Sequence, residues 1–342
     1  MPDASGALKL DWNEGTLTHP VVVDAVSRFL SHAGVVNWYP DVTCRRVVEP
    51  LTKLLNVPTE NILMFPGSDV ALDALVRTFV MPGDEAILLA PTYDNFRIYV
   101  ESCGAKVHHV NLADTLGFNV DEFVWRVEHL TSSPKIMYLV NPNNPIGYFI
   151  PPEEIRFLLS RFPETVMVVD EAYAEFAGSS SLPLIGEFPN LFVARSFSKA
   201  FALAGLRLGY LVSQSANLGH VNKVRNPKNI SMLAQVGAQA LLDRYELVQD
   251  YVDEVVAARS WFLEMMRSMG GVLFDSRANF VLMRVPEPKM VIQGLAESRI
   301  YARDRSYMAG LANMIRISIG TRSQMEQVVR AFQQLPTSLW RA

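Results

Sequence analysis

The chain has 342 residues, of which 49% are hydrophobic and 19% are charged. This is enough apolar material for a large buried core and excludes disorder as the main state. Lys and Arg number 31 and Asp and Glu 35, giving a formal net charge of −4 without a block of like charge, which argues against nucleic acid and an anionic membrane as main partners.

Short apolar runs alternate with longer amphipathic segments through the first two thirds of the chain. Helical spacing of apolar residues follows Gly67, and it recurs from Pro152 to Phe162. Strand–helix alternation of this kind predicts a mostly parallel sheet covered by helices. The expected strands are Ile62–Phe65, Ala86–Leu89, Lys106–Val110, Lys135–Val140, Val166–Asp170, Leu191–Ala194 and Leu206–Val212.

The pattern changes after about residue 230. Ser231 to Met269 is expected to form one long or broken helix that stops at Gly270-Gly271. Two further strands, Phe280–Val285 and Met314–Ile319, flank a helical stretch, which is typical of a smaller α+β domain. We therefore predict a large domain over residues 37–230 and a small C-terminal domain over residues 231–342, with an N-terminal segment, residues 1–36, that joins the small domain.

Cysteine usage and the N-terminus indicate a reducing compartment. Cys44 and Cys103 are too few for a disulfide framework or a cysteine-rich metal site. Residues 1–6 lack the basic start and apolar stretch of a secretory signal. Because the longest apolar runs fall far short of the roughly 18 residues that span a bilayer, we expect a soluble cytoplasmic protein.

Several common catalytic motifs are absent from the sequence. It contains no Walker loop, no His-Glu-x-x-His and no Gly-x-Ser-x-Gly, and Gly205 and Gly209 do not complete a dinucleotide fingerprint. His108 and His109 are adjacent on an expected strand, so their side chains point to opposite faces. We expect no metal site.

The most informative stretch runs from Arg195 to Gly209. It follows an expected strand and contains Ser196, Ser198, Lys199 and Arg207. Burial at a strand end lowers the pKa of a lysine and frees its amine as a nucleophile for a carbonyl. The hydroxyls and the guanidinium could hold a phosphate nearby. Taken alone, Lys199 is more simply a solvated lysine in a serine-rich loop.

Other strand ends carry matching signals. Asp170 ends an apolar strand, at the edge where open α/β sheets bind ligands. A buried acid there needs a cationic partner, which a pyridinium nitrogen, an arginine or a helix N-terminus could supply. The turn 141–147 and the helix start at 66–69 each have an ordinary structural explanation. In chain order, however, these signals form one constellation at the strand ends.

These motifs identify the chain as similar to a known family. Ser196-Phe197-Ser198-Lys199 with Arg207 eight residues on, Asp170-x-x-Tyr173 and Asn144-Pro145-x-Gly147 resemble the fold-type I aminotransferases that use pyridoxal 5′-phosphate, and among them the histidinol-phosphate aminotransferase group. The resemblance implies the PLP-dependent transferase fold type I. This is an α/β fold with a large domain, whose mostly parallel sheet is flanked by helices, and a smaller α+β domain.

The resemblance also assigns cofactor roles. It implies that Lys199 binds the cofactor aldehyde covalently and moves the proton in catalysis, and that Asp170 pairs with the pyridine nitrogen. Tyr173 and Asn144 match residues that hydrogen-bond the ring hydroxyl. Tyr93 matches the aromatic residue that stacks on the ring, although a core tyrosine is the simpler alternative.

A phosphate cup and a dimer follow from the same resemblance. Tyr39 resembles the tyrosine that reaches the phosphate of the neighbouring subunit, which implies a homodimer. The residues that match the cup are Gly67, Ser68, Asp69, Ser196, Ser198 and Arg207.

Substrate recognition is implied for two arginines. Arg316 lies on the face of its strand opposite to Ile315 and Ile317, so it is either a solvated edge residue or a bidentate carboxylate clamp. In the family, paired arginines matching Arg303 and Arg316 serve the phosphate of histidinol phosphate or the carboxylate of the amino-group partner. Asn144 is also expected at the substrate.

Three departures bear on the substrate. Ile146 replaces a usual threonine in a tolerant position, residues 13–15 lack a following Pro-rich turn, and Lys228 stands where the group often has tyrosine. The last two put histidinol phosphate itself in doubt while leaving the cofactor chemistry intact.

Three functions therefore remain open. The first is an aminotransferase that moves an amino group between an amino acid or phosphorylated amine and a 2-oxo acid. The second is a decarboxylase of a phosphorylated amino acid on the same scaffold. The third, a non-catalytic binding module, predicts a damaged catalytic set, whereas the set here is complete.

Overall fold

The computed structural model describes residues 6–32, 36–111, 116–130 and 132–341. Residues 1–5, on which part of the expectation about a secretory signal rests, lie outside the described residues. Within the described part, no helix combines the length and the apolar character needed to cross a bilayer.

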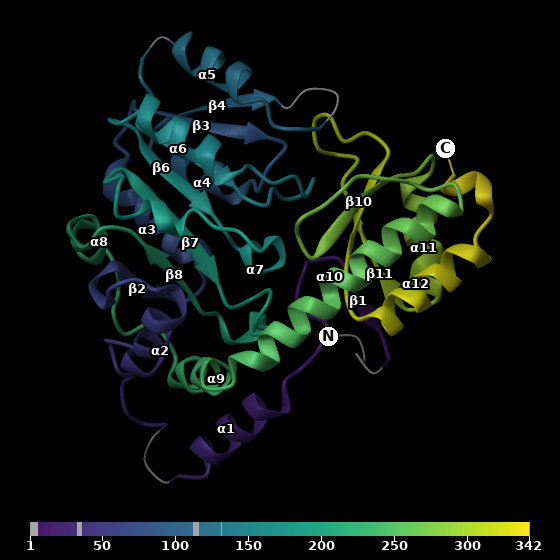
Figure 1. The fold of residues 1–342 in the computed structure, drawn as a ribbon, viewed down its shortest axis with the longest axis horizontal. Coiled ribbons are helices and arrows are strands. Elements are labelled where there is room, and N and C mark those ends of the chain that lie inside the picture. Colours follow the sequence, from purple (N-terminus) through teal and green to yellow (C-terminus); the bar gives the residue numbers. More distant parts are fainter. Residues whose placement is uncertain (1–5, 33–35, 112–115, 131, 342) are drawn as a thin grey trace.

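A seven-stranded sheet forms the centre of the larger lobe (Figure 1). Its spatial order is β2-β8-β7-β6-β5-β3-β4, and every neighbouring pair is parallel except the two pairs that contain β8. The predicted mostly parallel α/β sheet is therefore confirmed. The strands are β2 (Ile62–Phe65), β3 (Glu85–Ala90), β4 (Lys106–Asn111), β5 (Ile136–Val140), β6 (Val166–Asp170), β7 (Leu191–Ser196) and β8 (Gly209–Val212).

Helices cover both faces of this sheet, which explains why β5 and β6 are apolar along almost their whole length. One face packs against α3 (Ser68–Phe79), α4 (Asn95–Ser102) and α8 (Ser215–Asn222). The other face packs against α2 (Arg45–Leu55), α5 (Val120–Glu128), α6 (Pro152–Arg161), α7 (Ala174–Ala177), α9 (Met232–Leu242) and α10 (Tyr245–Ser268).

One expected strand differs from the structure, and one helical expectation is resolved by it. The strand expected over Leu206–Val212 begins only at Gly209, because η3 (Ala204–Leu206) is a 3₁₀ turn and Arg207 has a left-handed φ of 53°. Of the two forms expected for Ser231–Met269, one long helix or a broken one, the structure has the broken form, α9 and α10, because Arg244 has a non-helical backbone conformation.

A four-stranded antiparallel sheet forms the smaller lobe, in the order β12-β13-β10-β9. α10 runs from the larger lobe to the smaller one, and α12 packs against it (Figure 1). The elements of this lobe are β9 (Val272–Leu273), β10 (Phe280–Arg284), α11 (Pro288–Glu297), β12 (Arg303–Asp304), β13 (Met314–Ser318), α12 (Arg322–Gln334) and the 3₁₀ turn η4 (Thr337–Leu339), while the 3₁₀ turns η1 (Thr59–Asn61) and η2 (Leu182–Leu184) belong to the larger lobe.

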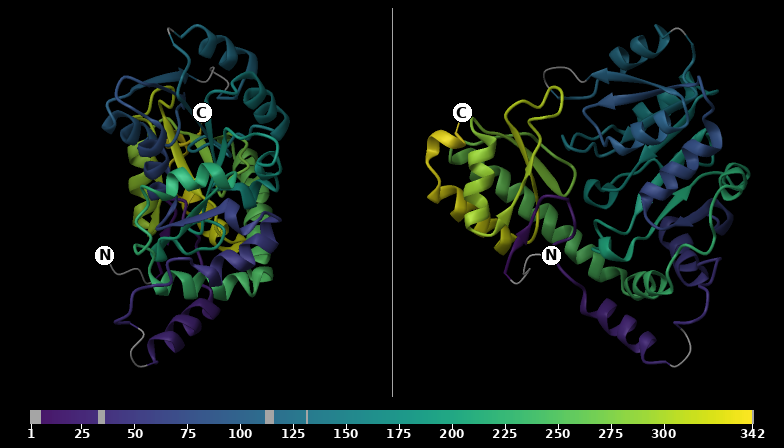
Figure 2. Two further views of the ribbon diagram at one scale, coloured as in Figure 1. Left: turned by 90° about the vertical axis from the view of Figure 1, so that its left-hand side faces the viewer. Right: turned by 180° about the vertical axis from the view of Figure 1, so that it is seen from behind.

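The N-terminal segment contacts both lobes. β1 (Leu8–Lys9) pairs in parallel with β11 (Ile300–Tyr301) beside the small sheet. Further along, α1 (Pro20–Leu30) packs against α9 at the lower edge of the molecule (Figure 2). Residues 10–19 therefore cross from one lobe to the other, next to the strand ends that carry the predicted site.

Candidate active site

Asp170 is a buried carboxylate at the carboxyl end of β6, with only 4% of its surface exposed. Its Oδ2 atom accepts a hydrogen bond of 2.7 Å from the hydroxyl of Tyr138, and its Oδ1 atom accepts one of 3.1 Å from the backbone N–H of Ala172. Both donors are neutral. Burial therefore dominates and raises the pKa of Asp170 to about 6.

Lys199 extends from the loop after β7 toward the N-terminal segment. Its Nζ atom donates a hydrogen bond of 3.0 Å to the carbonyl of Trp12 and lies 5.7 Å from the ring centre of Tyr173. Burial, together with the positive charge of Arg316, lowers the pKa of Lys199 to about 8. At pH 7 a pKa near 8 leaves about a tenth of this amine neutral, and thus nucleophilic, which is several hundred times the fraction for an ordinary lysine.

A polar chain begins at the start of α3. The hydroxyl of Tyr93 donates to Oδ1 of Asp69 over 2.7 Å and accepts from Nδ2 of Asn95 over 2.8 Å. The Nη2 atom of Arg207 lies 3.6 Å from Oδ2 of the same aspartate. The structure thus brings Asp69, Tyr93 and Arg207 together, although they are far apart in the sequence.

Two glycines allow the backbone of this region to approach closely. A Cβ atom on Gly209 would lie 2.5 Å from the backbone nitrogen of Ser68, and a Cβ atom on Gly67 would lie 2.6 Å from Nη2 of Arg207. The free N–H groups at the start of α3 and the Arg207 guanidinium therefore lie at one place. Nearby, Oγ of Ser196 accepts a hydrogen bond from the backbone N–H of Ser198.

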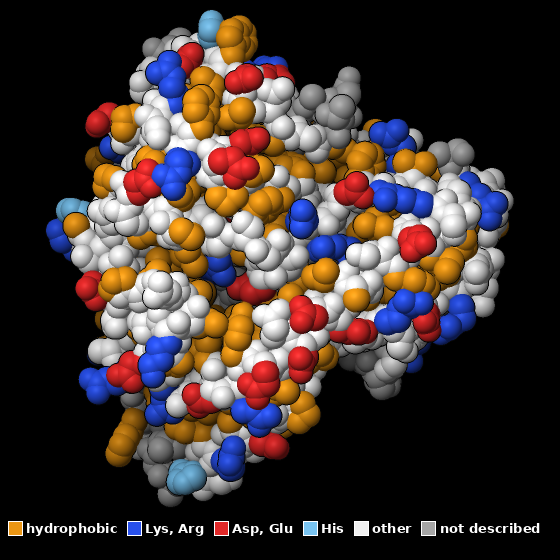
Figure 3. Space-filling model, in the orientation of Figure 1, with side chains coloured by type: hydrophobic (Ala, Val, Ile, Leu, Met, Phe, Trp, Pro, Cys, Tyr) orange, Lys and Arg blue, Asp and Glu red, His pale blue; other side chains and the backbone are white. Residues whose placement is uncertain are grey.

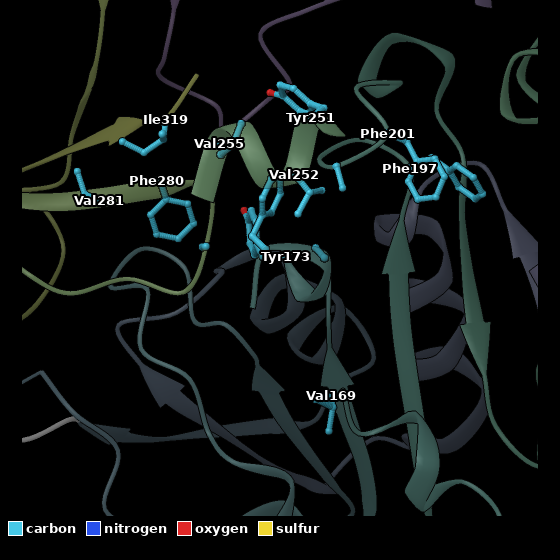
Figure 4. Close-up of a cluster of buried hydrophobic side chains, with 14 of the residues drawn as sticks. Val169, Tyr173, Phe197, Phe201, Tyr251, Val252, Val255, Phe280, Val281 and Ile319 are labelled. Carbon is cyan, nitrogen blue, oxygen red and sulfur yellow. The ribbon is translucent and has the colours of Figure 1, made fainter. Parts of the chain in front are cut away.

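Tyr173 lies between the two lobes. Its hydroxyl accepts a hydrogen bond of 3.1 Å from Nδ2 of Asn13, and its ring meets the ring of Phe280 edge to face at 5.2 Å (Figure 4). The backbone N–H of Asn13 donates to Oγ of Ser318 on β13 over 3.0 Å, and this hydroxyl donates to Oδ1 of Asn13 over 3.0 Å. The position of Tyr173 therefore depends on the N-terminal segment and on the small sheet.

Arg316 is the predicted clamp residue, and the structure excludes a solvated edge position for it. It lies on β13, between β12 and β10, and is only 2% exposed. Its Nη1 atom donates to Oδ1 of Asn144 over 2.6 Å and its Nη2 atom donates to the carbonyl of Asp11, while Nε has no partner among the described residues. Burial and the neighbouring Arg305 lower the pKa of Arg316 to about 9.

Arg303 and Arg305 share a face of the small sheet with Arg316. Arg303 is directly opposite Arg316 in the β12–β13 register, yet it is exposed. Arg305 is more buried, and its Nε atom has no partner in the described chain. Within the described residues no carboxylate forms an ion pair with any of the three, so this face carries uncompensated positive charge.

Tyr39 is not joined to this cluster within one chain. It is 78% exposed, and its ring lies 4.5 Å below Nζ of Lys228. Sequence reasoning also missed three contributors. Tyr138 had a signal, as the single hydroxyl in an apolar strand, and Asn13 had one in the N-terminal motif. Arg305 had no signal in the sequence other than its position two residues after Arg303.

Comparisons with known proteins agree over nearly the whole chain. The model of the family described as aminotransferase class I and II matches residues 4–332. A dihydroxyacetone phosphate transaminase of Campylobacter jejuni is 36% identical over 338 residues, which cover 96% of this chain and 90% of that protein. A histidinol-phosphate aminotransferase of Ruminiclostridium cellulolyticum is 33% identical, over 93% of this chain and 89% of that protein.

A solved structure agrees in fold. The histidinol-phosphate aminotransferase from Sinorhizobium meliloti, in complex with pyridoxal 5′-phosphate, has a TM-score of 0.85 and 26% identity. The superposition covers 95% of this chain and 89% of that one.

Proposed function

Because the chain belongs to the class I and II aminotransferases, which depend on pyridoxal 5′-phosphate, we propose that it transfers an amino group between an amino acid or phosphorylated amine and a 2-oxo acid. We further propose that the strand-end cluster is its active site. The observation that carries this proposal is that burial lowers the pKa of the Lys199 amine and raises the pKa of the Asp170 carboxyl, while the charge of Lys199 still acts on Asp170.

The side chains present fit the cofactor. Asp170 is a buried acid without a cationic hydrogen-bond partner in the described chain, and a protonated ring nitrogen would supply one. The N–H groups at the start of α3 with Arg207 offer a place for a phosphate. When bound, pyridoxal phosphate supplies an aldehyde for covalent attachment and a ring that withdraws electrons from the reacting carbon.

Each residue then has a defined task. The neutral amine of Lys199 is the nucleophile and afterwards the general base and acid that moves the substrate proton. Asp170 would keep the ring nitrogen protonated, and Tyr173 and Asn144 would hydrogen-bond the ring hydroxyl. Tyr93, oriented by its hydrogen bond to Asp69, would pack against the ring. The phosphate would be held by Gly67, Ser68, Asp69, Ser196, Ser198 and Arg207.

The guanidinium groups of Arg303, Arg305 and Arg316, which have no carboxylate partner among the described residues, support a phosphorylated substrate. Three arginines without carboxylate partners, one of them almost fully buried, are costly to fold unless an anion binds between them. The names of the two relatives denote molecules that carry a phosphate one carbon away from the reacting carbon. We assign Arg316 and Arg303 to the substrate anion and add Arg305, which faces the same space.

A half-reaction screen tests this function. The pyridoxal form is mixed with phosphorylated amines and with amino acids, and its conversion to the pyridoxamine form is followed by absorbance. We expect at least one 2-amino alkyl phosphate to convert the enzyme to its pyridoxamine form, and a 2-oxo acid to regenerate the pyridoxal form. Release of carbon dioxide without this conversion would instead indicate a decarboxylase. If no amine produced either signal, the result would indicate a non-catalytic binding module.

We also propose a cytoplasmic homodimer. Both cysteines are free, as expected for a reducing compartment. Tyr39 is exposed on the end of the chain segment before α2, next to the exposed Trp38, which supports a role at a neighbouring subunit. In such a dimer each Tyr39 completes the phosphate cup of the other chain.

A further inference from the structure

A cavity of about 730 Å³ opens on the side of the large sheet that faces α2 and α10. It is bounded by α7 and the loop after it, by the first residues of α6 and of α10, and by the last residues of α2. Figure 3 faces this side, and acidic and basic side chains lie together in a recess between α7 and α2. Lys199, Asp170 and Arg316 do not line the cavity, so it is separate from the candidate active site.

The floor of this cavity is a buried ionic network centred on Arg195. Its guanidinium donates two hydrogen bonds to Oε2 of Glu171, of 2.7 and 3.0 Å, and one of 3.1 Å to Oε1 of Glu175. Ser180 accepts a further bond of 2.8 Å. One guanidinium therefore serves two carboxyl groups, and its charge can balance only one of them.

Glu175 is the less fully hydrogen-bonded of the two carboxyl groups. Its side chain is only 9% exposed, and its Oε2 atom has no hydrogen-bond partner among the described residues. Burial raises the pKa of this carboxyl. An acceptor atom left unpaired inside a cavity costs free energy, and it therefore points to a missing donor.

The walls add aromatic surface. The rings of Phe201 and Tyr245 lie with their centres 6.0 Å apart, and Tyr210 lines the same cavity. Aromatic faces attract cations as well as apolar groups. The volume lies within the range of cavities that enclose a small organic ligand, roughly 300–1,000 Å³.

We propose that this cavity binds a small organic amine in its protonated form. The ammonium N–H donates to Oε2 of Glu175, and the apolar body of the amine packs against Tyr245 and Phe201. The cation balances the network charge that Arg195 alone leaves uncompensated. An anion of the same size is disfavoured at this position, because it would face the Glu175 carboxyl, and Arg156, a further cation in the lining, is already paired with Glu187.

The position of the cavity links it to the candidate active site through the backbone. Glu171 follows Asp170 at the end of β6, and Arg195 precedes Ser196 on β7. A ligand bound at the network therefore contacts residues next to the proposed cofactor contacts on β6 and β7. The consequence to measure is a change in the affinity of the protein for its cofactor.

Calorimetric titration of the holoenzyme with N,N-dimethyl-2-phenylethylamine tests the proposal. A tertiary amine cannot form an imine with an aldehyde, so chemistry at Lys199 does not interfere, and the result is independent of the proposed reaction. We expect saturable binding at one site per chain. The matched anion, 3-phenylpropionate, should give no saturable binding.

Two variants locate the binding. Glu175→Gln should weaken the affinity by about tenfold or more, while Glu153→Gln, at an exposed carboxylate of the same cavity, should leave it within about twofold. If Glu175→Gln does not fold, Tyr245→Leu replaces it and should also weaken binding. Absence of saturable binding, equal binding of the anion, or unchanged affinity in both Glu175→Gln and Tyr245→Leu would show that the cavity holds only water.

Discussion

The guanidinium of Arg316, on the small sheet, donates a hydrogen bond of 2.6 Å to the side-chain carbonyl of Asn144, in the loop after β5 of the large sheet. These residues are 172 positions apart in the sequence. The partner of this buried cation is an amide and not a carboxylate, so its charge stays available. The same contact that joins the lobes also leaves a positive charge facing the space between them.

The first prediction concerns the three arginines. Arg316→Ala should lower kcat/KM for a phosphorylated substrate by about 30-fold to several thousand-fold, since loss of one partner in a buried charged contact costs roughly 2–5 kcal/mol. Arg305→Ala should cost more than Arg303→Ala, because Arg305 is the more buried of the two. Steady-state kinetics of the three variants check this order, and equal effects of Arg303→Ala and Arg305→Ala would contradict it.

The second prediction concerns the pH dependence of Lys199. Its folded pKa of about 8 lies below the ordinary value of 10.5, and only the neutral amine attacks a carbonyl. In cofactor-free enzyme, labelling of Lys199 by pyridoxal and borohydride should therefore rise with pH through a midpoint near 8. Peptide mapping provides the measurement, and exposed lysines in the same digest serve as the internal control. A midpoint above 10 would mean that the site does not perturb this amine.

The third prediction uses Asp170, whose folded pKa of about 6 lies above its ordinary value of 3.8. The contribution of this carboxyl to stability is full below pH 3.8 and is lost as the pH rises through about 6. Cofactor-free Asp170→Asn should therefore be more stable than cofactor-free wild type at pH 8, by on the order of 1–2 kcal/mol. Urea unfolding at pH 8 measures this difference.

The same substitution should act in the opposite direction on the holoenzyme. Asparagine cannot balance a protonated ring nitrogen, so Asp170→Asn should bind the cofactor more weakly and lose most of its activity. A variant that is destabilised both with and without cofactor would show that Asp170 has only a structural role.

The fourth prediction tests the close approach of β8 to the start of α3. Gly209→Ala places a Cβ atom 2.5 Å from the backbone nitrogen of Ser68, which forces the phosphate-binding turn to move. We expect at least a tenfold loss of cofactor affinity, about 1.4 kcal/mol. Gly205→Ala, where no atom lies within 4 Å of the new Cβ, is the matched control and should bind the cofactor like wild type.

The fifth prediction tests the subunit arrangement. Tyr39→Ala and Lys199→Ala should each be nearly inactive as homodimers. After the two are unfolded together and refolded at equal amounts, half of the dimers are mixed and each has one intact site, so activity should return to about a quarter of wild type. Recovery requires that Tyr39 acts in the neighbouring subunit, and no recovery in verified mixed dimers would place it in its own.

The cofactor motif was open to sequence analysis because its signals are local. A lysine after a strand, an acid at the end of an apolar strand and a glycine before a helix each depend on a few neighbouring residues. The alternation of strand and helix also predicted the mostly parallel sheet, since covering both faces of a strand requires a continuous apolar run. The division into domains and the residue roles stay predictions.

Only the tertiary structure decided how charge is distributed around these residues. The tertiary structure showed that Arg316, which the sequence left as a possible solvated residue, is a buried cation without a carboxylate partner among the described residues, and that Arg305 is a neighbour of the site. The cavity at Glu175 combines residues from several helices and strands, which no local pattern reports. The physical reason is that desolvation and Coulomb interactions depend on distance in space, whereas helix caps, turns and strand patterns depend on distance along the chain.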